Sequence, residues 1–384
     1  HPDERWIAMV APTIRWPAQA RDLLDPRRSP LNPLWVPDRG EIRNFAYGHL
    51  PLYLHSLGGH AVAAVGRWLV QAAEETGSLA ELGRELQSYG HYARINVVGR
   101  VLSVIFDLGT LYLVYRLGKA IYGEAVGLLA AALLAVAVSH IQLAHFSTFD
   151  VITTFFITLS LYGSLRVIQA AEEGRRTLWP TVWAGAAAGW AVASKFSALP
   201  LVAVLVLAQV ATALRRERSR TRARGLYALG DRMWQLLPRI GLCLGVALLA
   251  FFLTSPFAIL DAPGYVKQIL EQSRMVRGLA DWPFTRQYLY TSPFVYSIEQ
   301  QVRWGLGWPL GIVAFAGFGW TVLRQFHRPR VEELALLGWA LPYFYLTGTF
   351  MVKFMRYMLP LLPIFILMGA ALIWAIRDWG IRDR

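Results

Sequence analysis

The chain has 384 residues, of which 55% are hydrophobic and only 16% are charged, and its mean hydropathy is +0.38. Soluble domains carry roughly a quarter charged residues, so this composition excludes a soluble globular protein and indicates a polytopic membrane protein. The net charge of +13 would suggest a nucleic-acid partner in a soluble protein, but the positions of the basic residues, described below, favour a membrane surface and no nucleic acid.

The first part of the chain, residues 1–92, has the pattern of a loop that lies outside the membrane. Prolines interrupt residues 1–46 repeatedly, so any helices there are expected to be short and to lie at the membrane surface. Residues 47–73 are apolar but contain three histidines, a proline and Arg67, which predicts an interfacial or re-entrant segment rather than a span. Residues 74–92 are polar and rich in Glu, and we expect a loop there.

From residue 93 onward, apolar segments recur at close to the roughly 20 residues that a bilayer demands. Segments of this composition must be helices in lipid, because the backbone has to satisfy its own hydrogen bonds. The residues from 93 to 384 are therefore predicted to form an all-α transmembrane bundle, with a long outer loop at 256–303. About nine spans are expected, at 93–115, 124–144, 149–169, 178–195, 198–214, 236–255, 304–323, 333–350 and 357–376.

The basic residues predict the orientation of this bundle. One set of connecting segments carries most of the Lys and Arg, above all the run between Arg215 and Arg224. The positive-inside rule places that side in the cytoplasm, where the run would meet anionic lipid headgroups. The opposite side, which includes the N-terminal loop, is then extracytoplasmic.

Two groups of carboxylates fall on the predicted outer side. Asp3 and Glu4 are adjacent, and either could serve as a base, although a solvated loop dipeptide explains them equally simply. Asp150 opens a predicted span, where a carboxylate can also act as a helix cap. His140, His145 and Asp150 do not have the spacing of a known metal site, so no metal ligand is predicted, and a requirement for a divalent metal stays open.

The first predicted span contains three charges, Arg94, Arg100 and Asp107. Arg100 and Asp107 are seven residues apart, so they share one helix face but lie about 10 Å apart along the axis. A charge at such a depth normally faces a cavity or a partner. An ion pair to another helix and a place in a functional site are both open.

Three cations lie at outer corners, where the positive-inside rule disfavours them: Lys195, Lys353 and Arg356. They either extend toward lipid phosphates or bind the phosphate of a ligand, for which Arg offers a fork of donors and Lys a point charge.

A carboxylate and several cations on one face suit the transfer of a sugar from a lipid phosphate. The phosphate is already a good leaving group, so it needs cations rather than a general acid. The acceptor hydroxyl needs one carboxylate to take its proton as the sugar is attacked.

The chain resembles the polyprenyl-phosphate-sugar-dependent glycosyltransferases of the GT-C class, in the branch of the protein O-mannosyltransferases and the aminoarabinose transferase (glycosyltransferase family 39). The resemblance rests on six stretches that run in the family's order from end to end. They are His1-Pro2-Asp3-Glu4, residues 47–53, Gly99-Arg100-Val101-Leu102-Ser103 with Asp107, residues 145–150, Ser194-Lys195-Phe196-Ser197, and residues 356–363.

This resemblance implies the GT-C fold, with short surface helices in the first outer loop, and an inverting transfer of a hexose, mannose-like, on the extracytoplasmic side. It implies that Asp3 is the catalytic base, with Glu4 beside it and Asp150 as the second acidic residue. It implies that Arg100, Lys195 and Arg356 bind the donor phosphate, and it leaves Asp107, His145 and Lys353 as further site candidates. The family has a membrane span just before the Asp-Glu pair, so we expect one to precede His1.

The partners implied are membrane lipid, a polyprenyl-phosphate monosaccharide as donor, and a protein or glycolipid acceptor. The expected location is a bacterial or archaeal plasma membrane. A transporter or lipid flippase is the alternative function, since buried charges in a bundle could also move a substrate.

Overall fold

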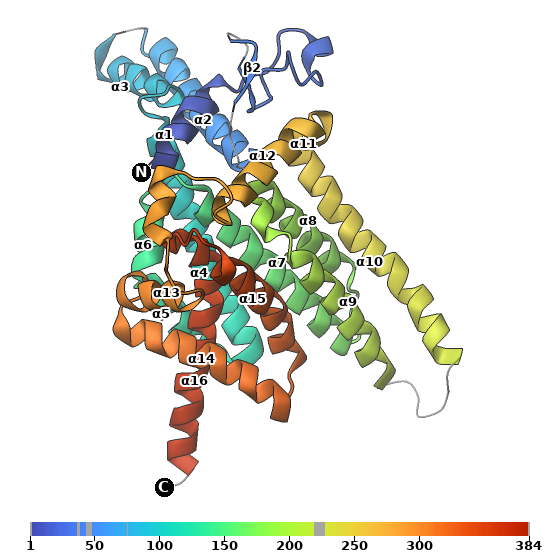
Figure 1. The fold of residues 1–384 in the computed structure, drawn as a ribbon. Coiled ribbons are helices and arrows are strands. Elements are labelled where there is room, and N and C mark those ends of the chain that lie inside the picture. The colour runs from blue at the N-terminus through green and yellow to red at the C-terminus, as the bar shows by residue number, and fades with distance from the viewer. Residues whose placement is uncertain (1, 37–38, 44–47, 75, 219–226, 383–384) are drawn as a thin grey trace.

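The computed structural model describes residues 2–36, 39–43, 48–74, 76–218 and 227–382, and these form a helical bundle with a smaller layer of helices at one end (Figure 1). The described part of the chain contains only one pair of strands, β1 (Trp35–Val36) and β2 (Glu41–Ile42), which pair antiparallel with Trp35 opposite Ile42. The all-α fold class predicted from the sequence is confirmed.

The bundle follows the predicted order of apolar segments. Its helices are α4 (Ile95–Tyr122), α5 (Glu124–Ala135), α6 (Val138–Ala144), α7 (Phe149–Glu172), α8 (Leu178–Ser194), α9 (Leu201–Arg218), α10 (Tyr227–Thr254), α14 (Trp308–His327), α15 (Val331–Thr349) and α16 (Leu362–Arg382). Short helical turns precede two of them, η4 (Phe196–Ala198) and η7 (Met355–Leu361).

Five helical segments among the described residues are long and apolar enough to cross a membrane, and they centre on α4, α7, α9, α10 and α16. The pair α5 and α6 would make a sixth if it is one span, because the two helices are bent by 60° at a short break. Helices α8, α14 and α15 occupy three further predicted positions without meeting that measure. The number of about nine spans therefore stays a prediction.

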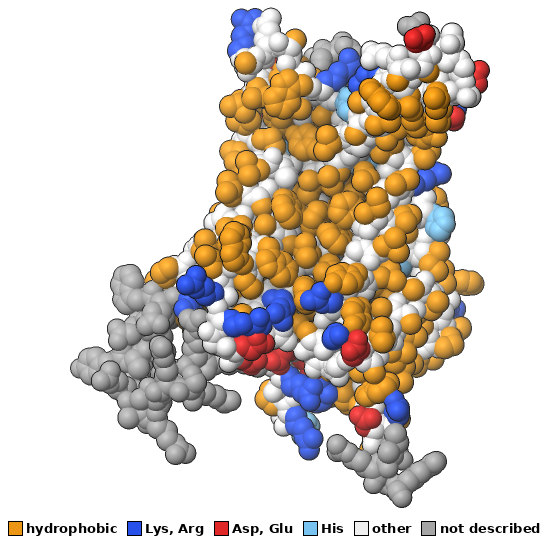
Figure 2. Space-filling model, turned by 180° about the vertical axis from the view of Figure 1, so that it is seen from behind, with side chains coloured by type: hydrophobic (Ala, Val, Ile, Leu, Met, Phe, Trp, Pro, Cys, Tyr) orange, Lys and Arg blue, Asp and Glu red, His pale blue; other side chains and the backbone are white. Residues whose placement is uncertain are grey.

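The centre of the bundle is formed by α7 and α16, whose most apolar windows are 78% and 72% buried, whereas that of α10 is only 11% buried. Helix α10 leans away from the rest at its end (Figure 1). Figure 2 shows the face of the molecule that is turned away from the viewer in Figure 1. This face is apolar over its middle, and Lys and Arg side chains gather toward its lower end. The basic run near Arg215 lies outside the side chains that the structure describes.

A layer of helices covers one end of the bundle. It contains α1 (Pro2–Val10), η1 (Ala11–Thr13), η2 (Ala20–Asp22), α2 (His49–Ala72), α3 (Gly77–Gln87) and η3 (Ser88–Gly90). A separate apolar core joins this layer to the bundle, because Ile7 and Ile14 pack with Leu52, Ile95 and Phe149.

One sequence expectation for this layer needs correction. Residues 74–92 are not a loop as expected, because α3 forms there. It packs on α2 where Gly66 meets Gly83; a Cβ on Gly66 would lie 2.5 Å from the Gly83 carbonyl oxygen, so the helices touch through their backbones. Helix α2 is continuous from His49 to Ala72, because Pro51 falls in its first turn, where a missing N–H costs nothing.

The expected outer loop at 256–303 is largely helical. It contains α11 (Phe257–Leu260), α12 (Ala262–Val276), η5 (Pro283–Tyr288), α13 (Val295–Gln300) and the π-helical turn η6 (Gln301–Gly305). Helices α11 and α12 of this segment lie at the same end of the molecule as α2 (Figure 1).

Candidate active site

Three carboxylates and three cations of the expected site form three pairs at this end of the bundle. Asp3 Oδ2 lies 2.5 Å from Arg356 Nη1. Glu4 accepts two hydrogen bonds from Arg100, from Nε at 2.9 Å and from Nη2 at 3.2 Å. Asp150 Oδ1 accepts a hydrogen bond from Lys195 Nζ at 2.6 Å. Each of the three cations thus contacts a carboxylate of the protein and is not directed only toward lipid.

Glu4 is held by hydrogen bonds from two different segments of the chain. Besides the Arg100 fork, its Oε1 accepts the backbone N–H of Ser147 at 2.9 Å. Burial opposes its ionisation, but the hydrogen bonds from Arg100 and Ser147 outweigh burial, so the pKa of Glu4 lies below its usual value. A carboxylate held in this way is a weak base and a good positioning group.

Asp150 lies in the first turn of α7, as expected, but its carboxylate binds a side chain and not only the helix end. Lys195 reaches it from the residue that follows α8. The two side chains are 2% and 15% exposed, so this is a buried ion pair.

The ring of Tyr357 lies close to two of the pairs. Lys195 Nζ is 4.9 Å from its centroid, and the guanidinium carbon of Arg356 is 6.0 Å from it. The Asp3–Arg356 and Asp150–Lys195 pairs therefore share one aromatic neighbour, which places both within reach of one small ligand.

A cavity of about 560 Å³ adjoins these groups. Lys195 and Tyr357 line it on one side, and Arg277, Ser273 and Gln272 of α12 and its C-terminal end line it on another. Its remaining walls come from η4 and α15 and are mainly apolar. A space of this size with a few convergent polar groups is typical of a ligand site.

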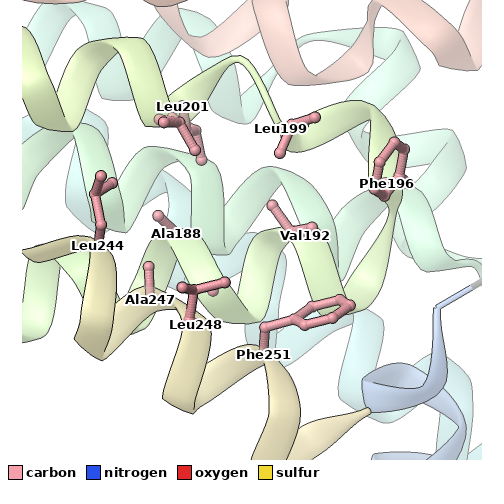
Figure 3. Close-up of a pocket in the computed structure, with 11 residues that line it drawn as sticks. Ala188, Val192, Phe196, Leu199, Leu201, Leu244, Ala247, Leu248 and Phe251 are labelled. Atoms are coloured by element: carbon pink, nitrogen blue, oxygen red, sulfur yellow. The ribbon is translucent and has the colours of Figure 1, made fainter. Parts of the chain in front are cut away.

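A second cavity, of about 310 Å³, lies between α8, the start of α9, and α10 (Figure 3). Its lining is apolar and includes Val192, Leu244 and Phe251. Phe196 and Leu199 line both cavities, so a polar space and an apolar space are adjacent.

Several residues of this region cannot be identified as site residues from the sequence. His49, at the start of α2, is fully buried, and neither ring nitrogen has a hydrogen-bond partner within the described part of the chain. Arg277 stands out in the sequence only as one basic residue of the outer segment. A lone His or Arg has no spacing pattern, and the only signal is that residues 47–53 and 256–303 fall on the outer side.

The other three site candidates lie elsewhere. Asp107 accepts a hydrogen bond from His140 Nδ1 at 2.9 Å, inside the bundle. His145 is exposed, and its Nδ1 bonds the Ile141 carbonyl. Lys353 is buried and donates to the Thr291 hydroxyl at 2.9 Å. The structure does not bring these three into the cluster of pairs.

Within the residues that the structure describes, no three His, Cys, Asp or Glu side chains are grouped so that they could hold a metal ion.

The bundle and its outer layer define a polytopic membrane protein with the GT-C glycosyltransferase fold. Residues 94–260 match the family model described as dolichyl-phosphate-mannose-protein mannosyltransferase. This match, together with the solved structures below, confirms the resemblance to GT-C glycosyltransferases that the motifs predicted. A search of curated protein sequences finds no match to this chain.

The crystal structure of ArnT from Cupriavidus metallidurans bound to undecaprenyl phosphate is similar, with a TM-score of 0.57 and 16% identity, and the alignment covers 99% of this chain. An oligosaccharyltransferase from Archaeoglobus fulgidus, tethered to an acceptor peptide, is similar with a TM-score of 0.53 and 15% identity over 98% of this chain. The chain spans 58% of the length of the first protein and 45% of the second.

Proposed function

We propose that this chain transfers a monosaccharide from a polyprenyl-phosphate donor to an acceptor hydroxyl on the extracytoplasmic side of a membrane. The observation that carries the proposal is that the Asp3–Arg356 and Asp150–Lys195 pairs both lie beside Tyr357, next to a cavity that Lys195 and Arg277 also line. A base and several cations are thus available to one bound molecule.

The reaction needs two kinds of group. As the acceptor oxygen attacks the anomeric carbon, the bond from that carbon to the phosphate oxygen breaks, and the acceptor proton passes to a carboxylate. The phosphate leaves with its bonding electrons, and cations stabilise its negative charge. Attack from the face opposite the phosphate inverts the anomeric carbon.

Asp3 is our choice for the base. Glu4 is held by three hydrogen bonds and has a lowered pKa, which makes it a poorer proton acceptor. The Asp150 side chain is 2% exposed, against 11% for Asp3, so Asp3 is the more accessible. Arg100 then serves chiefly to hold Glu4, and this differs from the phosphate-binding role that the family resemblance implies.

The donor phosphate is placed in the larger cavity, between Lys195 and Arg277. The Lys195 ammonium already binds Asp150 but carries three donors, so it can also bind a phosphate oxygen. Among the similar structures, that of ArnT is bound to undecaprenyl phosphate, and one of the archaeal oligosaccharyltransferase is a complex with a dolichol-phosphate. Both ligands are lipid phosphates of the proposed donor class.

Membranes that contain the full-length protein and a radiolabelled polyprenyl-phosphate hexose provide the test. Wild type should release free polyprenyl phosphate when membrane extract is added as acceptor. Asp3→Asn should lower this turnover by about 100-fold to 10,000-fold, because an amide cannot take the proton, while donor binding is largely kept.

The matched control is Asp281→Asn, which neutralises an outer carboxylate that is 64% exposed and forms an ion pair with Arg286. It should keep wild-type turnover. Unchanged turnover in Asp3→Asn would refute the base assignment. A folded wild type that releases nothing from a panel of lipid-linked sugars would refute the enzyme and favour the transporter or flippase.

A further inference from the structure

One face of α4 makes three polar contacts to three different segments of the outer end. Arg100, Ser103 and Asp107 are spaced by three and four residues, so they lie on the same helix face. Arg100 binds Glu4 of α1, the Ser103 hydroxyl donates to the Phe146 carbonyl at 2.9 Å, and Asp107 accepts from His140 of α6.

The last contact acts on a short helix next to a break in the bundle. Helix α6 has seven residues and is separated from α5 by a break at which the chain bends by 60°. Because such a short helix has little stability of its own, side-chain contacts must fix its position.

Helix α6 leads directly into the segment that holds Glu4. The Ser147 N–H binds Glu4, and Asp150 follows three residues later in the first turn of α7. A shift of α6 would therefore move the donor to Glu4 and the start of α7 together.

Helix α6 also contacts the segment that leads to Arg356. A Cβ placed on Gly305 would lie 2.7 Å from the Ser139 hydroxyl and 2.1 Å from Oε1 of Gln301, so η6 packs closely on α6. Gln301 in turn donates to the Met355 carbonyl at 2.7 Å, next to Arg356. Contacts of α6 thus lead to both the Glu4 and the Arg356 parts of the site.

The chemistry of the Asp107–His140 contact indicates more than packing. His140 is 2% exposed and Asp107 is 13% exposed. Two apolar side chains would hold α6 at a lower desolvation cost, whereas a hydrogen bond between an imidazole and a carboxylate fixes one orientation of the helix. Rigid support for reacting groups is what such contacts provide in active sites.

We propose that Asp107 and His140 are positioning residues, which fix α6 so that Ser147, Glu4 and Asp150 keep the geometry needed for transfer. This inference rests on the proposed function, since the transfer reaction is what the geometry serves. Neither residue lines the cavity in which the donor phosphate is proposed to bind.

The first test measures turnover per folded molecule. Asp107→Val should lower kcat by about 10-fold to 100-fold with donor KM nearly unchanged, because misplacement by about 1 Å has effects of this size. Asp107→Asn keeps an acceptor for His140 and should retain most of the rate. His140→Asn, whose side-chain amide can donate in place of Nδ1, should retain a higher kcat than His140→Leu.

A double-mutant cycle separates positioning from general stability. Arg100→Lys loosens Glu4 from the same helix face, so Asp107→Val should have a much smaller effect in that background than in wild type. Additive effects would overturn the inference. Thr110→Val is the control, since the Thr110 hydroxyl is buried in α4 and donates to the Phe106 carbonyl of its own helix.

A second test needs no activity. Thr148 is fully buried, and its hydroxyl has no hydrogen-bond partner in the described chain. This position should therefore tolerate the substitution Thr148→Cys, and the accessibility of the new thiol reports on how firmly the segment between α6 and α7 is held. In a Cys243→Ala background, labelling of this thiol by a maleimide in detergent should be slow and should accelerate at least about 10-fold with Asp107→Val, but not with Thr110→Val. Unchanged labelling would overturn the inference.

The two proposals fail in different ways. If wild type transfers no sugar, the proposed function fails and the labelling result still decides whether Asp107 and His140 fix the segment. If wild type transfers sugar and the cycle is additive, only the positioning inference fails.

Discussion

At the scale of residues, the three carboxylates expected to take part in catalysis, Asp3, Glu4 and Asp150, are each bound to one of the cations expected at the donor phosphate. The sequence predicts the six residues, because acidic and basic side chains beside apolar segments stand out. The sequence does not predict their pairing, since the partners are far apart along the chain: 96 residues separate Glu4 from Arg100, and 45 separate Asp150 from Lys195. Only the packing of α1, α4, α7 and α8 decides which cation meets which carboxylate.

The buried pair between Asp150 and Lys195 makes an energetic prediction. Lys195→Met leaves the Asp150 carboxylate buried without its partner, and we expect a loss of about 3–5 kcal/mol in stability. Lys195→Met combined with Asp150→Leu removes both charges, and the stability of this double variant should be closer to that of wild type than the stability of either single variant. Thermal unfolding in detergent measures this, and simple additivity of the two single variants would contradict it.

At the scale of elements, the sequence predicts the positions of the bundle helices well and their breaks poorly. Helix α7 begins at Phe149 and α8 ends at Ser194, within one residue of the expected ends. The break between α5 and α6 has no signal in the sequence, because the stretch from Leu134 to Val138 contains neither proline nor glycine. Tertiary contacts such as that of His140 fix the break, and periodicity cannot reveal them.

Close helix contact is visible at Gly317 of α14. A Cβ there would lie 2.4 Å from the backbone nitrogen of Gly369 in α16, so the two helices pack through glycines. We expect Gly317→Val to destabilise the bundle by about 1–3 kcal/mol through overpacking. Gly319→Val is the control, since nothing lies within 4 Å of its Cβ position. Comparable melting temperatures for both variants would show that this contact does not limit stability.

At the scale of the whole molecule, an apolar middle separates two polar ends that carry different chemistry. The all-α class and the GT-C resemblance are predictable because span length and motif order are properties of the whole chain. The cavities are not predictable, since their walls come from helices such as α8, α10, α12 and α15, whose spacing depends on packing.

The outer layer should loosen in mild acid. Burial lowers the pKa of His55 to about 4, while its Nδ1–H donates to the Pro51 carbonyl and its Nε2 accepts from the Ser147 hydroxyl. The unfolded segment would take up a proton first, so this stability is present above the ordinary pKa of about 6.5 and is lost as pH falls toward 4. Glu4, whose pKa is also lowered, adds to the loss below its ordinary range.

Hydrogen exchange of α1–α3, corrected for the intrinsic rates, should therefore accelerate between pH 7 and pH 5, while α7 and α16 remain protected. The shift of His55 corresponds to about 3 kcal/mol at most. His55→Gln should reduce the pH dependence. If the corrected exchange rate of α1–α3 in wild type did not change with pH, His55 would not be protected from protonation in the folded protein.

The pairing of the site residues has one more consequence. Asp3, Glu4 and Asp150 balance Arg356, Arg100 and Lys195 charge for charge, so these six side chains together are electrically neutral before any ligand arrives. A neutral group of charges produces only a weak field beyond its immediate surroundings. Apart from the single positive charge of Arg277 on the cavity wall, little long-range attraction would then act on an anionic lipid, which would reach the cavity by diffusion in the plane of the bilayer at a rate that depends only weakly on ionic strength.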